Sequence, residues 1–174
     1  MNVILNMSMS LNGMVAREND STDFLTHGEW LRFVELAHQT HALVWGRRTH
    51  EIVRGYGEPV LHGFDGLARI VVSRDPNFPL ELGWQVATSP QQALALLTSA
   101  GQTQVLLGGG PRLNRAFACT GLINQVIIFM DSVIVGRGIP LFAPEVFDLH
   151  LHLLDLKQVH EEIVQLRYQV GSTV

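Results

Sequence analysis

Apolar runs about the length of a β-strand recur along the chain, and stretches with helical periodicity separate several of them. The runs predict strands at residues 3–9, 42–45, 69–73, 84–87, 104–107 and 125–130. Helices are predicted at residues 29–39, from residue 90 onward and at residues 111–119. Continuous apolar runs such as residues 126–129 are typical of strands buried on both faces. The pattern therefore predicts an α/β fold with a mostly parallel central sheet flanked by helices.

Capping residues support two of these helices. Thr26, followed three residues later by Glu29, has the spacing of a capping box. Ser89 precedes Pro90, which suits the first position of a helix, and Gly101 follows the last periodic residue. The boundaries of both helices are thus predicted from local chemistry.

The last part of the chain has a different pattern. Residues 149–153 and 163–168 alternate apolar and polar positions, which predicts an antiparallel strand pair and makes the sheet mixed. The glycine-rich loop at residues 55–66 is too short to separate two domains, and no repeat or low-complexity linker is present. We expect residues 1–174 to form a single domain.

Composition narrows the classes of partner. The chain is 47% hydrophobic and 16% charged, with a net charge of −4, so a nucleic acid is not expected as partner and a small molecule is. Neither a secretion signal nor an apolar run of membrane-spanning length is evident, so we expect a soluble cytoplasmic protein without a membrane partner. The single cysteine, Cys119, is predicted to lie in the core of a helix.

The most informative segment is the triple glycine Gly108, Gly109 and Gly110, between a predicted strand and a predicted helix. Glycines at such a junction allow backbone N–H groups to approach an anion, and the helix start adds a partial positive charge. The alternative is a tight turn that binds nothing. The spacing matches neither the phosphate-binding loop of nucleotide hydrolases nor a full G-x-G-x-x-G motif, so it predicts a phosphate site but names no nucleotide.

Two further predicted strands end in residues suited to an anion. Gly46, Arg47, Arg48 and Thr49 follow one of them, and Ser73 with Arg74 follows another. Arginine forks and a hydroxyl at a helix start are good phosphate ligands, although solvated arginines at loop edges are the alternative. In open α/β sheets ligands gather at the carboxyl ends of strands, so the three ends are predicted to converge on one extended anionic ligand.

Five segments in order resemble dihydrofolate reductase-like proteins, and most of all the reductase domain of riboflavin biosynthesis and its stand-alone relatives. They are Met-Ser-Leu-Asn-Gly-Met-Val-Ala at 9–16, Trp-Gly-Arg-Arg-Thr-His-Glu at 45–51, Val-Val-Ser-Arg at 71–74, Leu-Gly-Gly-Gly at 107–110 and Val-Gly-Arg-Gly-Ile-Pro-Leu-Phe at 135–142. The resemblance extends over almost the whole chain.

This resemblance implies an NADPH-dependent oxidoreductase that transfers hydride to a C=N or similar unsaturated bond in a pyrimidine or pteridine-like substrate. The implied type is a 5-amino-6-(5-phosphoribosylamino)uracil reductase; the alternatives are dihydrofolate reductase proper and a non-catalytic NADPH-binding or sensing module. A homodimer is expected from the family and from the apolar final strands.

The implied cofactor residues fall into three groups. The pyrophosphate is expected at the triple glycine and the helix start behind it, the adenosine 2′-phosphate at the arginines, and the nicotinamide beside the first strand and the loop after it. The residues are Gly108, Gly109, Gly110, Arg112, Leu113, Gly46 and Thr49 for the phosphates, Arg47, Arg48, Ser73 and Arg74 for the 2′-phosphate, and Ser8, Val15 and Ala16 for the nicotinamide.

The proton donor is the least defined part of the expected site. Asp23 and Glu29 are the acidic candidates near the first loop, although Glu29 has an alternative role as the capping partner of Thr26. Riboflavin reductases usually have aspartate where this chain has Asn12, and an asparagine cannot supply a proton, although its amide can hold a substrate or a turn.

The histidines and aromatic residues do not predict a further ligand site. Histidine pairs such as His150 with His152 lack nearby cysteine or carboxylate ligands, so no metal is expected. The aromatic residues Trp30, Phe33 and Phe117 are predicted to pack in the core rather than to form a stacking surface for a ligand.

Overall fold

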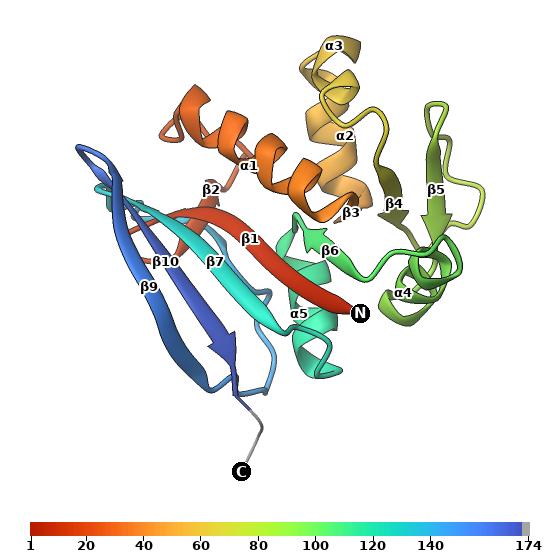
Figure 1. Ribbon diagram of the computed structural model, residues 1–174. Coiled ribbons are helices and arrows are strands. Elements are labelled where there is room, and N and C mark those ends of the chain that lie inside the picture. The colour runs from red at the N-terminus through yellow and green to blue at the C-terminus, as the bar shows by residue number, and fades with distance from the viewer. Residues whose placement is uncertain (172–174) are drawn as a thin grey trace.

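The computed structural model describes residues 1–171, and its centre is one eight-stranded sheet in the order β5-β4-β3-β6-β1-β7-β10-β9 (Figure 1). The strands are β1 (Asn2–Ser10), β3 (Ala42–Gly46), β4 (Ala68–Val72), β5 (Trp84–Ala87), β6 (Gln104–Leu107), β7 (Gln125–Asp131), β9 (Leu151–His160) and β10 (Ile163–Val170). The pairings among β5, β4, β3, β6, β1 and β7 are all parallel. Strand β10 runs antiparallel to both β7 and β9. The predicted mixed, mostly parallel sheet is confirmed.

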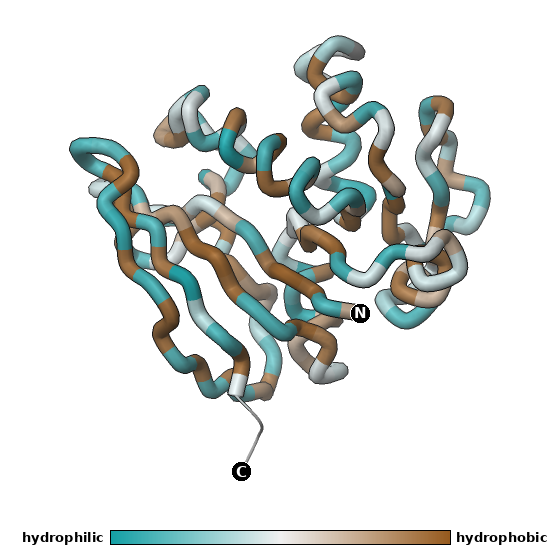
Figure 2. The backbone as a smooth tube through the Cα atoms, viewed as in Figure 1, coloured by the Kyte–Doolittle hydropathy of each residue, from teal (hydrophilic) through white to brown (hydrophobic). Residues whose placement is uncertain are grey.

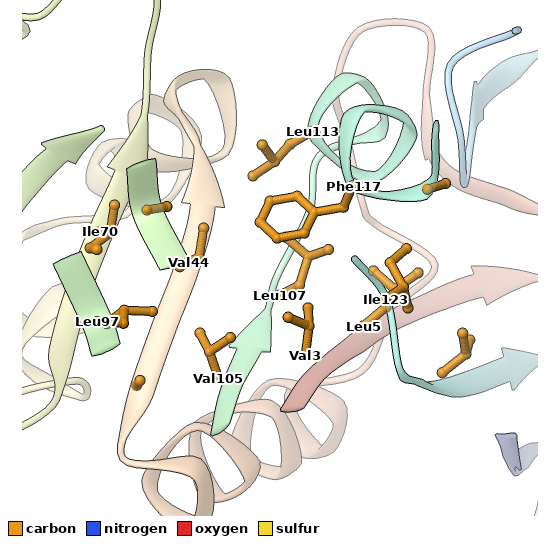
Figure 3. Close-up of a cluster of buried hydrophobic side chains, with 14 of the residues drawn as sticks. Val3, Leu5, Val44, Ile70, Leu97, Val105, Leu107, Leu113, Phe117 and Ile123 are labelled. Carbon is orange, nitrogen blue, oxygen red and sulfur yellow. The ribbon is translucent and has the colours of Figure 1, made fainter. Parts of the chain in front are cut away.

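Helices cover both faces of this sheet. The first three are α1 (His27–Thr40), α2 (Arg47–Gly55) and α3 (Glu58–His62), and the last two are α4 (Pro90–Ser99) and α5 (Pro111–Cys119). One buried cluster joins the sheet to α4 and α5, where Phe117 packs beside Leu107, Val3 and Leu5 (Figure 3). A second cluster joins the opposite face to the first three helices through residues such as Trp45 and Phe64. The two faces explain why the central strands are apolar at consecutive positions (Figure 2).

The capping residues predicted from the sequence mark the observed starts of α1 and α4. The capping box between Thr26 and Glu29 is present, and the Ser89 side chain accepts a hydrogen bond from the Gln92 N–H, with Pro90 at the first helical position. Helix α1 extends somewhat beyond the predicted residues 29–39 at both ends. These elements confirm that short-range capping chemistry sets the helix boundaries.

Three features differ from the expectations. The glycine-rich loop at 55–66 contains α3, and the antiparallel pair of β2 (Met14–Arg17) with β8 (Gly138–Pro140) was not predicted. Strand β9 begins at Leu151 and continues through the polar stretch that was expected to be a connection. Cys119 is exposed at the last position of α5, so the prediction that it lies in the helix core was wrong.

Candidate active site

Three strand ends meet at one edge of the sheet. Gly46 at the end of β3 pairs with Val72 at the end of β4, and Val44 pairs with Leu107 at the end of β6. The residues that follow, Ser73 and Gly108, therefore lie on either side of the β3 terminus. The convergence predicted from the sequence is a consequence of this parallel register.

Two helices begin at this edge without a side-chain cap. Gly46 is the N-cap of α2 and Gly110 is the N-cap of α5, and neither has a side chain to accept a hydrogen bond from the first helical N–H groups. The two starts touch, because the Gly46 N–H donates to the Gly109 carbonyl over 2.7 Å. Helices α1 and α4, by contrast, are capped by Thr26 and Ser89. The positive ends of two neighbouring helix dipoles are thus left for an external anion.

The glycines in this loop are closely surrounded. A Cβ atom on Gly108 would lie 2.7 Å from Phe33 Cζ, and one on Gly109, where φ is +84°, would lie 2.8 Å from Met7 Sδ. A Cβ on Gly110 would lie 3.2 Å from Thr49 Oγ1, which places that hydroxyl next to the loop. The loop can therefore present backbone rather than side chains to a ligand.

A buried acceptor beside the loop is unsatisfied. Asn114 of α5 is fully buried, and its Nδ2 donates to the Leu141 carbonyl over 2.8 Å, while its Oδ1 has no partner among the described residues. This oxygen lies 3.9 Å from where a Cβ of Gly109 would be. The uncapped helix starts and the side-chain-free loop fit the pyrophosphate region of a dinucleotide, whereas the Asn114 oxygen, as an acceptor, would need a donor from the ligand.

The arginines near the loop differ in their availability. Arg47 is paired with Glu51 at 2.8 Å and lies over the Phe78 ring, and Arg48 is paired with Asp20 at 2.6 Å. Arg74 is exposed and takes part in no ion pair among the side chains that the structure describes. Arg112 near the start of α5 is also exposed. Arg74, which follows β4 directly, and Arg112 are thus cations that a phosphate group can engage without displacing a carboxylate, whereas Arg47 and Arg48 are already paired.

Ser73 is buried, and its Oγ accepts a hydrogen bond from the Asp75 N–H over 3.1 Å. Its hydroxyl shapes the turn that presents Arg74. Leu113 is likewise buried, behind the loop on the face that packs against the sheet. Ser73 and Leu113 therefore lie at the predicted cofactor site, where they hold the backbone of its loops in place.

A cavity of about 450 Å³ opens between β1, α1 and α2, next to the glycine loop. Its polar lining includes Asn6, Ser8 and Thr49, and Val15 of β2 also lies on it. The prediction of core packing is confirmed for the fully buried Phe117. Trp30 and Phe33 are half-buried: they pack against the core cluster of Trp45 and Phe64, and they also line the cavity. The volume is in the range of small-molecule sites, and its aromatic wall suits a flat heterocycle.

Glu29 combines a structural contact with a free oxygen. Its side chain lines the cavity, although the residue is only 3% exposed. Oε2 accepts hydrogen bonds from the Thr26 N–H at 2.8 Å and from the Thr26 hydroxyl at 3.2 Å. Oε1 is buried and has no partner among the described residues. The capping role and a chemical role are therefore compatible, because they use different oxygens.

Asp131 is a site residue that the sequence did not reveal. It ends β7, is only 5% exposed, and one of its oxygens, Oδ2, is buried without a partner in the described chain. Burial is the largest cause that raises the pKa of Asp131, to about 7; the negative charge of Glu29 and the hydrogen bond that a protonated Asp131 can donate to Glu29 add to it. The only signal in the sequence was a lone acidic residue directly after an apolar strand.

The other polar candidates have different surroundings. Asp23 is exposed and lies 2.6 Å from Arg17, and this hydrogen bond lowers the pKa of its carboxyl group. Asn12 donates to the Val135 carbonyl and accepts from the Val135 N–H and the Ser10 hydroxyl. The Asn12 amide is therefore occupied in holding the loop between β1 and β2, and neither residue is among those lining the cavity.

A fully buried histidine, His50, lies in the first turn of α2. The Trp45 indole N–H donates to His50 Nδ1 over 3.2 Å, so His50 Nε2 carries the proton and donates to Glu81 over 2.8 Å. Burial lowers the pKa of His50, which agrees with a neutral ring. Within residues 1–171, no three His, Cys, Asp or Glu side chains converge as a metal site. None of the described helices has the length and hydrophobicity needed to cross a membrane.

The chain is similar to two uncharacterized proteins of Bacillus subtilis. YwjB is 28% identical over 168 residues, which cover 95% of each chain. YyaP is 20% identical over 189 residues, which cover 95% of this chain and 93% of its own. The similarity therefore extends over nearly the full length of both relatives.

Solved structures with the same fold include proteins of riboflavin biosynthesis. A putative riboflavin biosynthesis protein from Shewanella sp. PV-4 superposes with a TM-score of 0.78 at 19% identity, over 99% of this chain and 100% of its own. RibD from Acinetobacter baumannii gives a TM-score of 0.79 at 19% identity, and this chain spans 58% of its length. A pyrimidine reductase-like protein from Corynebacterium diphtheriae gives 0.78 at 16% identity, over 99% of this chain and 92% of its own.

The sequence profile of the RibD C-terminal domain matches residues 1–165. The match covers the strands that carry the glycine loop, the arginines and the cavity. The chain therefore belongs to the RibD C-terminal domain family.

Proposed function

We propose that this protein is an NADPH-dependent reductase that transfers hydride to a C=N or similar unsaturated bond of a pyrimidine or pteridine-like substrate. The observation that carries the proposal is the pair of uncapped helix starts at Gly46 and Gly110, in contact with each other and next to an open cavity. When bound, NADPH supplies the hydride, so the protein needs no nucleophile. The residues of the chain have to bind the cofactor and the substrate, orient them, and protonate the substrate.

The proposed division of the site follows its geometry. The glycine loop and Thr49 receive the pyrophosphate, and Ser8 and Val15 face the nicotinamide from β1 and β2. The substrate ring lies in the remaining cavity against the aromatic wall of Trp30 and Phe33. Holding both rings in a small apolar space orients them for hydride transfer and excludes water.

The proton is proposed to come from Glu29. Its free oxygen Oε1 belongs to the buried carboxyl group at the cavity, whereas Asp23 is exposed and paired with Arg17. A buried acid next to the substrate suits general acid catalysis better than a solvated ion pair does. The 2′-phosphate is proposed to lie at Arg74, because Arg47 and Arg48 are already paired with carboxylates.

Cofactor binding and turnover test this proposal. NADPH at 100 times its Kd is expected to stabilise the protein by about 2.7 kcal/mol in a thermal-shift measurement. Its absorbance is expected to fall with 5-amino-6-(5-phosphoribosylamino)uracil, which is the reductase substrate named for a Thermotoga maritima relative of the same fold. Dihydrofolate and a quinone complete the panel of acceptors. Binding without turnover across the panel would favour the sensing module.

Arg74→Ala separates the two nicotinamide cofactors. Removing a charge-assisted contact to the 2′-phosphate is expected to weaken NADPH binding by about 10-fold or more and to leave NADH binding unchanged. Arg167→Ala is the matched control, because Arg167 is also an exposed arginine but lies on β10, far along the sheet from β4. Equal effects of the two variants on NADPH, or equal affinity of the wild type for NADPH and NADH, would refute this assignment.

We further propose that the chain forms a homodimer through β9. This strand is the edge of the sheet, and hydrophobic positions are interleaved along it (Figure 2). Leu151, Leu153 and Leu156 are 41%, 56% and 59% exposed, and they pair with Val170, Tyr168 and Leu166 of β10. An apolar edge strand exposed in this way is typical of an interface.

A charged pair of substitutions tests the dimer. Leu153→Lys combined with Leu156→Lys is expected to convert a dimer to a monomer in light scattering coupled to gel filtration, because two charges cannot be buried unpaired. Leu82→Lys is the control, since Leu82 is 99% exposed in a loop. A monomeric wild type would refute the proposal, as would a dimer that withstands the double substitution.

A further inference from the structure

A second carboxyl group lies behind the proposed acid. Glu29 comes from the first turn of α1 and Asp131 from the end of β7, and both are nearly inaccessible to solvent. Each has one oxygen, Glu29 Oε1 and Asp131 Oδ2, that is buried and finds no donor in the described residues. Two buried carboxylates next to each other cannot both remain ionised at low cost, whereas one proton between them satisfies both orphaned oxygens.

The residues around Glu29 and Asp131 provide no positive charge that would favour ionisation of both carboxyl groups. Asp131 is flanked in the sheet by Ser10 of β1 and Ile163 of β10, and neither carries a charge. Glu162, in the turn before β10, is exposed. Glu29 is the group whose charge acts on Asp131, and no arginine or lysine offsets it. Structural carboxylates are normally given a cation or several N–H donors, so this arrangement serves another purpose than packing.

We infer that Glu29 and Asp131 form a proton-sharing pair, in which Asp131 keeps Glu29 supplied with the proton that the reduction consumes. Asp131 is a positioning residue, because it acts through Glu29 and does not line the cavity. The inference rests on the proposed function and specifies its proton path.

The reduction consumes one hydride and one proton. Bound NADPH would supply the hydride for the new C–H bond at the carbon of the C=N group, whose π electrons would pass to the nitrogen, and the cofactor would leave as NADP⁺. That nitrogen takes the shared proton from Glu29, which leaves the pair doubly ionised. The repulsion between two carboxylates then draws a proton from solvent and restores the pair for the next turnover.

The first test measures stability against pH without any ligand. A group whose pKa is raised in the folded state favours folding while it is protonated, so the free energy of unfolding is expected to fall as pH rises from about 4 through about 7. Asp131→Asn has nearly the same shape but no charge to lose. Its Tm is expected to match that of the wild type below about pH 4 and to exceed it at pH 8. Parallel curves for the two proteins across this range would overturn the inference.

The second test is the pH dependence of kcat with NADPH and 5-amino-6-(5-phosphoribosylamino)uracil. The wild-type rate is expected to fall as pH rises through about 7, when the pair loses its proton. In Asp131→Asn the group with the raised pKa is absent, so the descending limb near pH 7 is expected to be lost. His27→Gln is a matched control, because His27 is another titratable group at the cavity. A limb that shifts with His27 and not with Asp131 would overturn the inference.

The two tests distinguish the inference from the proposed function. If stability titrates as expected while NADPH is not oxidised, the pair stands and the reductase proposal fails. If NADPH is oxidised with the same pH profile in both the wild type and Asp131→Asn, the reductase proposal stands and the pair fails.

Discussion

Glu29→Gln is expected to lower kcat about 100- to 1000-fold while KM changes little, because general acid catalysis by a positioned side chain contributes on this scale. Glutamine at this position can still accept hydrogen bonds from Thr26, so the capping box and the fold should be retained. What the variant loses is the carboxyl oxygen Oε1, through which the proton is proposed to pass. The measurement is steady-state oxidation of NADPH by the substrate that gives turnover, with Tm recorded in parallel.

Asp23→Asn is the matched control for this prediction, because Asp23 was the other acidic candidate in the sequence. The carboxyl group of Asp23 is exposed and paired with Arg17, and a surface ion pair contributes little to stability. We expect kcat within about twofold of the wild type for this variant. A large loss with Asp23→Asn and none with Glu29→Gln would assign the proton to the first loop and contradict the assignment to α1.

The parts of the site that could be predicted from the sequence are those encoded locally. Gly108, Gly109 and Gly110 stand between an apolar run and a helical pattern, and the register of β3 with β4 and β6 then brings Gly46 and Ser73 to the same edge. The family motifs added the identity of the expected ligand. A parallel sheet makes such prediction possible, because all carboxyl ends of its strands face the same side.

The parts that could not be predicted depend on contacts between distant segments. Asp131 ends a strand in which every other signal is apolar, and only the folded sheet brings it against Glu29. Strands β2 and β8 are short and lack clear alternation, so their pairing also had no signature. Trp30 and Phe33 have the helical spacing of core residues, and only the position of α1 at the cavity separates them from Phe117.

The β2–β8 pair provides the second large expected effect. Gly138→Ala is expected to destabilise the protein by about 2–3 kcal/mol, because a Cβ there would lie 2.5 Å from the Ala16 carbonyl oxygen. That oxygen belongs to the backbone, so relief requires β2 to move away from β8. For a chain of this size the change corresponds to a decrease in Tm of roughly 5–10 °C, which differential scanning calorimetry can measure.

The same displacement has a functional consequence, which separates Gly138 from a merely structural glycine. Val15 lies on β2 and lines the cavity, so a β2 strand pushed outward is expected to weaken NADPH binding as well. Gly136→Ala is the matched control two residues earlier, because a Cβ at Gly136 meets nothing within 4 Å. The free energy of unfolding of Gly136→Ala should stay within about 0.5 kcal/mol of the wild-type value. If both variants lose stability and affinity equally, the effect belongs to the flexibility of the whole segment and not to the close approach of β8 to β2.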